Sequence, residues 1–190
     1  MKNTDEIAAE MLPIRLIISI VVIAAVAAMI TIGYINLSIV LAENQVEKEC
    51  RTLESELYTM MGSGIARDVD EVSSSEGTKR THAFELPDNL AYLAFGVDPD
   101  INNDGVLETG LTCNGSVIFY RVGGGSKHVI WLSEEFKFRE GNYTDDKWVI
   151  KENGQGLIIN GGGKTTLVFE FVQKHDERYI LIQKNDLIEP

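Results

Sequence analysis

Cysteine, histidine and proline are scarce in this chain of 190 residues, with 2, 3 and 4 copies. His82, His128 and His175 are isolated, and the sequence contains no C-x-x-C pair and no cluster of histidine with cysteine. It therefore lacks the ligand spacing of a structural zinc site or a haem attachment site. It also lacks the G-x-S-x-G motif of a serine hydrolase. We expect a protein that is not an enzyme and has no cofactor, with calcium as the one candidate ligand.

Positive charge is also in short supply. Lysine and arginine number 17 against 29 aspartates and glutamates, which gives a net charge of -12. An acidic surface repels phosphate backbones, so we expect no nucleic-acid partner. The same surface favours solubility and contact with cations or basic surfaces.

Charge is absent altogether between Arg15 and Glu43. Residues 14–41 read IRLIISIVVIAAVAAMITIGYINLSIVL, whereas about 20 apolar residues are enough for a transmembrane helix. The apolar region of a cleaved signal peptide is shorter, roughly 7–15 residues, and no A-x-A cleavage pattern follows here. We therefore predict a transmembrane or filament-core helix, preceded by a short polar leader or tail over residues 1–13.

Small side chains are frequent within this apolar segment. They are Ala24, Ala25, Ala27, Ala28 and Gly33. Such residues let helix backbones approach closely, which favours association with other copies of the chain. Alanine is also common in plain membrane anchors, so association and simple anchoring both stay open.

The helix is predicted to continue beyond the apolar segment. No proline occurs between residues 14 and 66, and apolar or small residues recur at spacings of three and four. These residues are Val46, Cys50, Leu53, Leu57, Met60 and Gly64. The stripe predicts an amphipathic extension that packs either on the chain's own C-terminal domain or on neighbouring copies. Residues 67–80 are polar and are predicted to be a linker.

From Thr81 onward the pattern is typical of β-strands. Predicted strands are 81–86, 90–97, 115–122, 127–133, 135–139, 147–151, 156–160, 164–173 and 177–184. The glycine runs at 123–125 and 161–163 each lie between two of these segments and predict hairpin turns. Because no helix separates the strands, we predict an antiparallel β-sandwich-like domain over residues 81–190. The whole chain is then an α+β protein with a long hydrophobic and amphipathic N-terminal helix.

One loop of this domain is rich in side-chain oxygens. Four of these residues precede Gly105 and one follows it. They are Asp98, Asp100, Asn102, Asp104 and Glu108. Alternating oxygen ligands followed by glycine resemble the first half of a calcium-binding loop. Counted from Asp100, the twelfth position is Leu111 rather than the bidentate glutamate of an EF-hand, which excludes that motif. We predict the five residues as candidate calcium ligands, and the alternative is an Asp/Asn-rich turn without metal.

Two further features favour an extracellular location for the C-terminal domain. Asn114 and Asn142 begin Asn-x-Ser/Thr sequons and are candidate glycosylation sites. Outside the cytoplasm, a single pair of cysteines favours a disulfide, here between Cys50 and Cys113. Two separate buried thiols are the alternative.

Several aromatic residues fall within or beside the predicted strands. They are Tyr120, Trp131, Phe136, Tyr143 and Trp148. Aromatic side chains in a sandwich more often fill the core than line a binding face, so we predict core positions for them.

The order of these segments resembles that of type IV pilins. A short polar N-terminus, an apolar helix, an unbroken amphipathic continuation and a C-terminal β-domain follow one another, and residues 3–12 (NTDEIAAEML) are similar to the N-termini of archaeal pilin-like and archaellin-like proteins. The resemblance implies a structural or adhesive subunit of a surface filament, whose core is a bundle of the N-terminal helices and whose β-domains lie outside. The resemblance also implies that a leader peptide is removed. The family has an acidic residue five positions into the mature helix, and Glu10 would take that position if the chain were cut between Asp5 and Glu6.

The resemblance has departures that leave a second function open. The family's leader is usually cut after a charged residue that is followed by glycine or alanine, and this sequence has no clean match to that pattern. In addition, Arg15 is unexpected in the core of a helix bundle. The alternative is a single-pass, membrane-anchored extracytoplasmic module that binds a cell-surface ligand or calcium. An anchored enzyme is a third and weaker hypothesis, because no catalytic constellation is recognisable.

Overall fold

The computed structural model describes residues 4–71, 73–104, 106–108, 110–144, 147–151 and 155–184, with side chains from residue 14 onward. The chain divides into two units, Met1–Val40 and Leu41–Pro190. Helix α1 runs over Thr4–Ser63, and the rest of the second unit is rich in β-strands. The α+β class and the long N-terminal helix are therefore confirmed. The side chains of the predicted leader, including those of Asp5, Glu6 and Glu10, lie outside the described residues.

Helix α1 ends at a glycine. The N–H of Gly64 donates a hydrogen bond of 2.7 Å to the carbonyl of Met60. A Cβ at position 64 would collide with that carbonyl and would lie 2.9 Å from Oγ1 of Thr78. The same hydroxyl accepts the N–H of Ile65 at 2.8 Å, so the chain turns away from the helix at this point.

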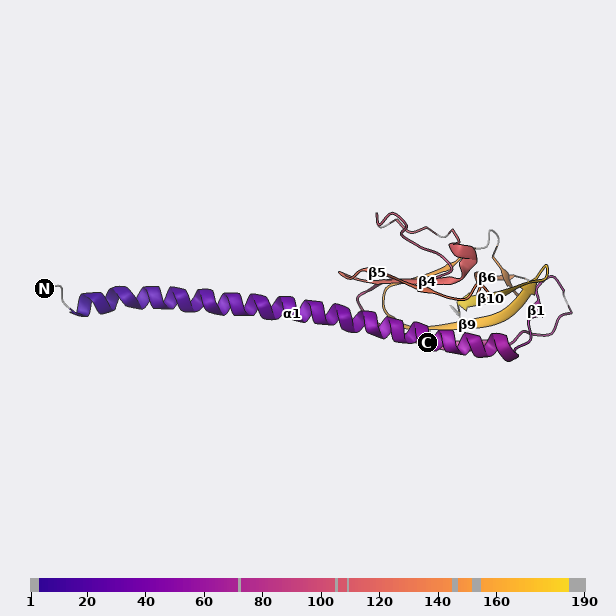
Figure 1. The fold of residues 1–190 in the computed structure, drawn as a ribbon, viewed down its shortest axis with the longest axis horizontal. Coiled ribbons are helices and arrows are strands. Elements are labelled where there is room, and N and C mark those ends of the chain that lie inside the picture. Colours follow the sequence, from indigo (N-terminus) through magenta and orange to yellow (C-terminus); the bar gives the residue numbers. More distant parts are fainter. Residues whose placement is uncertain are drawn as a thin grey trace. The chain divides into compact units, whose positions relative to one another are not determined.

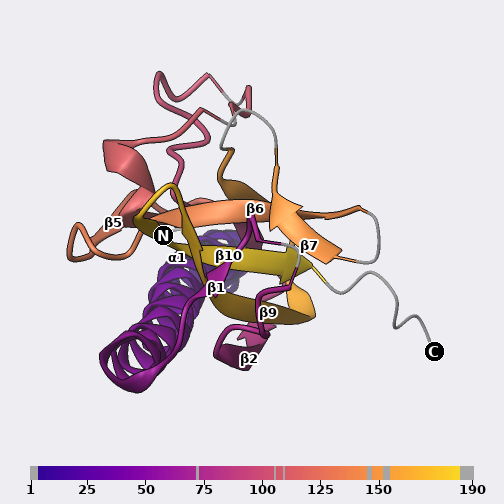
Figure 2. The ribbon, with the colours of Figure 1, turned by 90° about the vertical axis from the view of Figure 1, so that its right-hand side faces the viewer.

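Two sheets make up the β-rich part of the second unit. The first contains β1 (Arg67–Asp68), β9 (Gly163–Lys174), β10 (Glu177–Lys184), β6 (Phe138–Thr144) and β7 (Lys147–Ile150) in that order, with β2 (Lys79–Leu86) also paired to β9. The second contains β5 (Lys127–Trp131), β4 (Val117–Val122), β3 (Leu90–Phe95) and β8 (Leu157–Asn160). A short 3-10 helix, η1, spans Cys113–Gly115. Figure 2 shows β9, β10 and β6 side by side in the first sheet.

Most strand pairs are antiparallel, as predicted for this domain, and two pairs are parallel. β1 pairs with β9 and β10 pairs with β6 in parallel, and the remaining pairs are antiparallel. The segment 67–80, expected as a linker, contains β1 and the start of β2. The strand predicted at 135–139 begins only at Phe138, because Phe136 belongs to a turn in which its N–H donates to the carbonyl of Ser133.

The two glycine runs behave differently. Residues 123–125 form the hairpin between β4 and β5, as predicted. Residues 161–163 do not form a hairpin, because β8 belongs to the second sheet and β9 to the first. Gly162 passes so close to Pro87 that a Cβ would collide with the Pro87 carbonyl. This glycine run therefore carries the chain from one sheet to the other.

Phenylalanines from both sheets meet in the core. Phe95 of β3 lies 5.9 Å from Phe84 of β2, 5.5 Å from Phe138 of β6 and 5.9 Å from Phe169 of β9, measured between ring centroids. All four side chains are buried. The cluster joins the two sheets into one hydrophobic core.

The predicted stripe of α1 packs on this core. Val46, Cys50, Leu53, Leu57 and Met60 are each 0% exposed within the second unit. The stripe thus contacts the chain's own β-domain rather than neighbouring copies, and Figure 1 shows the end of α1 running along the strands. Full burial of an aliphatic side chain contributes roughly 1.5–3 kcal/mol, so this contact holds the helix end firmly.

Candidate functional site

The apolar part of α1 is exposed over residues 14–37, and Ser38 and Ile39 are half-buried. Ile23 and Ile30 are 68% and 67% exposed, and large apolar side chains around the whole helix circumference are similarly open. This helix is long and apolar enough to cross a membrane, judged by length and composition. A surface of this kind is stable only when lipid or other apolar helices cover it.

The serine and threonine hydroxyl groups within this apolar segment are satisfied by the helix itself. Ser19 Oγ donates to the Arg15 carbonyl and Thr31 Oγ1 to the Ala27 carbonyl, both at 2.9 Å. Ser38 Oγ donates to the Ile35 carbonyl at 2.8 Å. These internal hydrogen bonds remove the cost of placing hydroxyl groups in a medium without water.

Polar contacts accompany the apolar stripe where α1 meets the β-domain. The ring of His82 lies between two helix carboxylates, with Nδ1 3.0 Å from Glu56 Oε2 and Nε2 3.3 Å from Glu49 Oε2. Gln45 Nε2 donates to the carbonyl of Glu85 at 2.6 Å. In the described part of the chain, these groups hold no metal-binding set of three or more His, Cys, Asp or Glu side chains. Their geometry is that of a structural contact.

Two aspartates of the predicted calcium loop contact basic side chains of the same chain. Lys127 Nζ lies 2.9 Å from Asp98 Oδ2 and donates to the carbonyl of Asp100 at 2.9 Å. Arg121 lies 3.6 Å from the Asp100 carboxylate. The ammonium group of Lys127 thus contacts oxygens of two of the predicted calcium ligands.

In the second half of the loop, the described polar groups form hydrogen bonds within the loop. Asn102 Nδ2 donates to Asp104 Oδ2 at 2.8 Å, and Asp104 Oδ1 accepts the N–H of Val106 at 2.7 Å. The N–H of Glu108 donates to the carbonyl of Pro99. Among the described residues, the five predicted ligands are not gathered into a metal site. These contacts are typical of an Asp/Asn-rich turn, and calcium binding by the loop stays a prediction.

The predicted Cys50–Cys113 disulfide is not formed. Cys50 is buried where the stripe of α1 packs on the sheets, Cys113 is exposed in η1, and both are free thiols. The stripe directs Cys50 into the core, whereas the turn of η1 places Cys113 at the surface. Burial, with a smaller contribution from Glu49, raises the pKa of the Cys50 thiol to about 12.

Both predicted glycosylation sites are exposed. Asn114 follows Cys113 in η1 with φ of 56°, and its carbonyl accepts a hydrogen bond from Arg139. Asn142 lies near the end of β6, with its amide 3.2 Å from Thr144 Oγ1. Exposure makes both side chains accessible.

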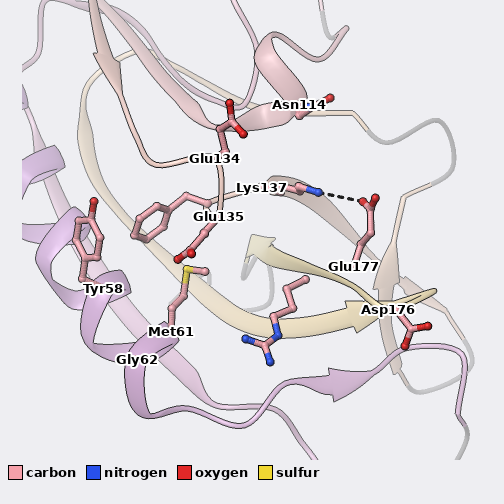
Figure 3. Close-up of a pocket in the computed structure, with 11 residues that line it drawn as sticks. Tyr58, Met61, Gly62, Asn114, Glu134, Glu135, Lys137, Asp176 and Glu177 are labelled. Atoms are coloured by element: carbon pink, nitrogen blue, oxygen red, sulfur yellow. Dashed lines mark hydrogen bonds and ion pairs between the residues drawn. The ribbon is translucent and has the colours of Figure 1, made fainter.

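One cavity among the described residues lies at the end of α1. It has a volume of about 610 Å³, and we call it the α1-end cavity. Figure 3 shows Tyr58 and Met61 on its helix side and Glu134, Glu135 and Lys137 on the facing loop. Tyr58 packs edge-on against Phe136, with ring centroids 4.6 Å apart. Its lining combines an aromatic wall with carboxylates and with the cations Lys137 and Arg178, and the described lining contains no histidine or cysteine.

A second cavity of about 410 Å³ opens beside β1 and β7, and we call it the Arg67 cavity. At its base, Arg67 Nε donates to Glu170 Oε1 at 2.7 Å and Nη2 donates to Glu170 Oε2 at 3.0 Å. Nη2 also donates to the carbonyl of Trp148 at 2.7 Å. Gln183 and the N–H of Gly77 complete the contacts of the Glu170 carboxylate. The side chains of Arg67 and Glu170 are 11% and 2% exposed, so this is a buried, bidentate ion pair.

Comparisons with protein families, with curated proteins and with solved structures found no match for this chain. What the chain does must therefore be argued from its own residues.

The aromatic residues divide between core and surface. Phe136 and Tyr120 are buried as predicted, whereas Trp131 and Tyr143 are 60% and 53% exposed. Sequence reasoning missed the Arg67–Glu170 pair, because the two residues are far apart in the chain and Arg67 lies in a segment expected as a linker. A lone arginine in a polar stretch carries no local signal of burial.

Proposed function

We propose that this protein is a structural or adhesive subunit of a type IV pilus-like surface filament, assembled through residues 14–40 of α1. One observation carries the proposal: the apolar segment is exposed around its circumference within the first unit, while the stripe that follows is buried in the second. The apolar segment therefore requires partners, whereas the buried stripe does not. Lipid covers it before assembly, and the same segments of other copies cover it in the filament.

The β-domain then forms the outer surface. Its net negative charge and the exposed sequons at Asn114 and Asn142 support an extracellular position in this proposal. The small residues of the apolar segment supply the close helix contacts. Gly33 has no atom within 4 Å of the position a Cβ would take, so in the isolated chain it serves no packing purpose.

A pair of variants tests the proposal. Gly33→Leu is expected to abolish filaments in electron microscopy of the producing cells and to reduce the oligomer fraction in mild detergent at least tenfold, because the bulky side chain separates the helices. Ile32→Leu, at the neighbouring exposed position, conserves volume and is expected to assemble normally. The urea midpoint of the β-domain should be the same in both.

A second function, an anchored binding module, is favoured by the two cavities of the β-domain. It predicts a native N-terminus that still begins at Met1, and a monomer in detergent. Mass spectrometry of the native chain together with its detergent-solubilised size distinguishes the two. An uncut, monomeric wild-type protein would contradict the filament proposal.

A further inference from the structure

The Arg67 cavity has the chemistry of a sugar-binding site. We propose that it binds one ring of an uncharged saccharide, with Tyr143 and Trp148 against the ring face and Arg67 donating to a hydroxyl group. The proposal concerns a site that the filament assembly does not use, and it holds whether or not the chain assembles.

Arg67 supplies fixed donors. Its Nε and Nη2 atoms are held by Glu170 and by the carbonyl of Trp148. The two N–H groups of Nη1 have no acceptor in the part of the chain that the structure describes, and Arg67 lines the cavity. Because the bidentate pair orients the guanidinium before a ligand arrives, binding costs little side-chain entropy.

An aromatic pair forms another wall of the cavity. Tyr143 of β6 and Trp148 of β7 are cross-strand partners, with ring centroids 5.5 Å apart. Both residues line the cavity, and the Tyr143 side chain is largely exposed. A pyranose presents a face of C–H groups that packs on an aromatic ring, while its hydroxyl groups remain free for hydrogen bonds. An exposed aromatic pair beside oriented donors fits such a ligand.

The charges of the cavity favour an uncharged ligand. The lining contains three cations, Arg67, Lys79 and Lys147, and three carboxylates, Glu71, Glu76 and Glu170. Lys79 lies 3.1 Å from Glu76, and Arg67 pairs with Glu170, so much of this charge is neutralised within the wall. A carboxylate or phosphate ligand would meet the acids at close range. Hydroxyl groups both donate and accept, and so they match a wall of mixed donors and acceptors.

The two tryptophans of the chain allow a direct measurement. Trp131→Phe leaves Trp148 as the single tryptophan reporter. The full chain, solubilised in a detergent without a sugar headgroup and produced in a host without N-glycosylation, is titrated with the methyl glycosides of glucose, galactose, mannose and N-acetylglucosamine. We expect a saturable change in Trp148 emission with at least one of them. Saturation-transfer NMR should show the strongest signals on the C–H protons of one ring face.

Variants connect the signal to the cavity. Tyr143→Ala should weaken binding at least tenfold, and Tyr58→Ala, which removes an exposed tyrosine from the α1-end cavity, should change it less than twofold. Arg67→Lys keeps the positive charge but removes the free Nη1 donors and should also weaken binding. The urea midpoint of each variant reports whether it has folded.

Three results would overturn the proposal. One is the absence of any response to all four glycosides at the highest soluble concentration. Another is preferential binding of methyl glucuronide or inorganic phosphate over every neutral glycoside. The third is unchanged affinity in a folded Tyr143→Ala variant. None of these results bears on filament assembly, which the Gly33→Leu experiment tests separately.

Discussion

At the scale of single residues, the two cysteines have opposite environments. Cys50 faces the sheets from α1, and Cys113 is exposed in η1. A thiolate is the reactive form of cysteine, and burial disfavours it. The raised pKa of about 12 therefore makes Cys50 inert in the folded chain.

We predict that a thiol reagent such as 5,5′-dithiobis(2-nitrobenzoate) labels one cysteine of the folded chain quickly and the other only after unfolding. Even at pH 9, where an ordinary exposed thiol is substantially ionised, Cys50 should stay protonated and unreactive. Cys113→Ser should remove the fast phase completely, and Cys50→Ser the urea-dependent phase. Failure of both thiols to react in urea without reductant, with recovery after reduction, would instead indicate the disulfide.

The buried ion pair of Arg67 and Glu170 could not be predicted from the residues near either partner in the sequence. A carboxylate in a strand of alternating apolar residues is normally expected on the solvent side. Glu170 is instead buried, because parallel pairing of β1 with β9 brings the guanidinium of Arg67 against it. Breaking a buried ion pair leaves one uncompensated charge and typically costs about 3–5 kcal/mol. Only the pairing of distant strands makes this burial favourable, and the local sequence does not encode it.

At the scale of elements, the helix was more predictable than the sheets. Spacings of three and four residues place Val46 through Met60 on one face of any helix, and five of the six predicted stripe residues are buried. The sixth, Gly64, lies just beyond the helix end and is half-buried. Most strand positions followed from local alternation in the same way, but β1 and most of β6 did not. The pairing of strands did not, because the parallel pairing of β6 with β10 and the crossing at Gly161–Gly163 depend on contacts between distant segments.

The stripe gives a prediction at this scale. Leu53→Ala should lower the free energy of unfolding by about 2–5 kcal/mol, because it leaves a cavity between α1 and the sheets. Arg51→Ala, on the exposed side of the same helical turn, removes only surface ion pairs with Glu47 and Glu54 and should cost less than about 1 kcal/mol. Urea unfolding followed by circular dichroism measures both. Equal, small effects would mean that the helix end contributes little to the domain.

At the scale of the whole molecule, the two units have surfaces of different polarity and so need different surroundings. The second unit buries its own apolar stripe and carries a surface rich in acidic groups. The first presents isoleucine, valine and leucine around an entire helix without a charge between Arg15 and Glu43. A helix of this composition transfers favourably into lipid, whereas the acidic domain does not. The proposed filament subunit and the anchored module share this division.

Two arginines in the apolar segment test that division. Val26→Arg together with Ile30→Arg should release the chain from the membrane fraction in an alkaline carbonate wash, because each arginine near the middle of a spanning helix costs roughly 3 kcal/mol. The matched control, Ile101→Arg with Val106→Arg, places the same charges on exposed apolar residues of the β-domain and should leave the chain in the membrane fraction. If the Val26 and Ile30 variant sediments like the wild type, the apolar segment is not the membrane anchor. If the control variant is also released, the β-domain contributes to membrane attachment through its exposed loop.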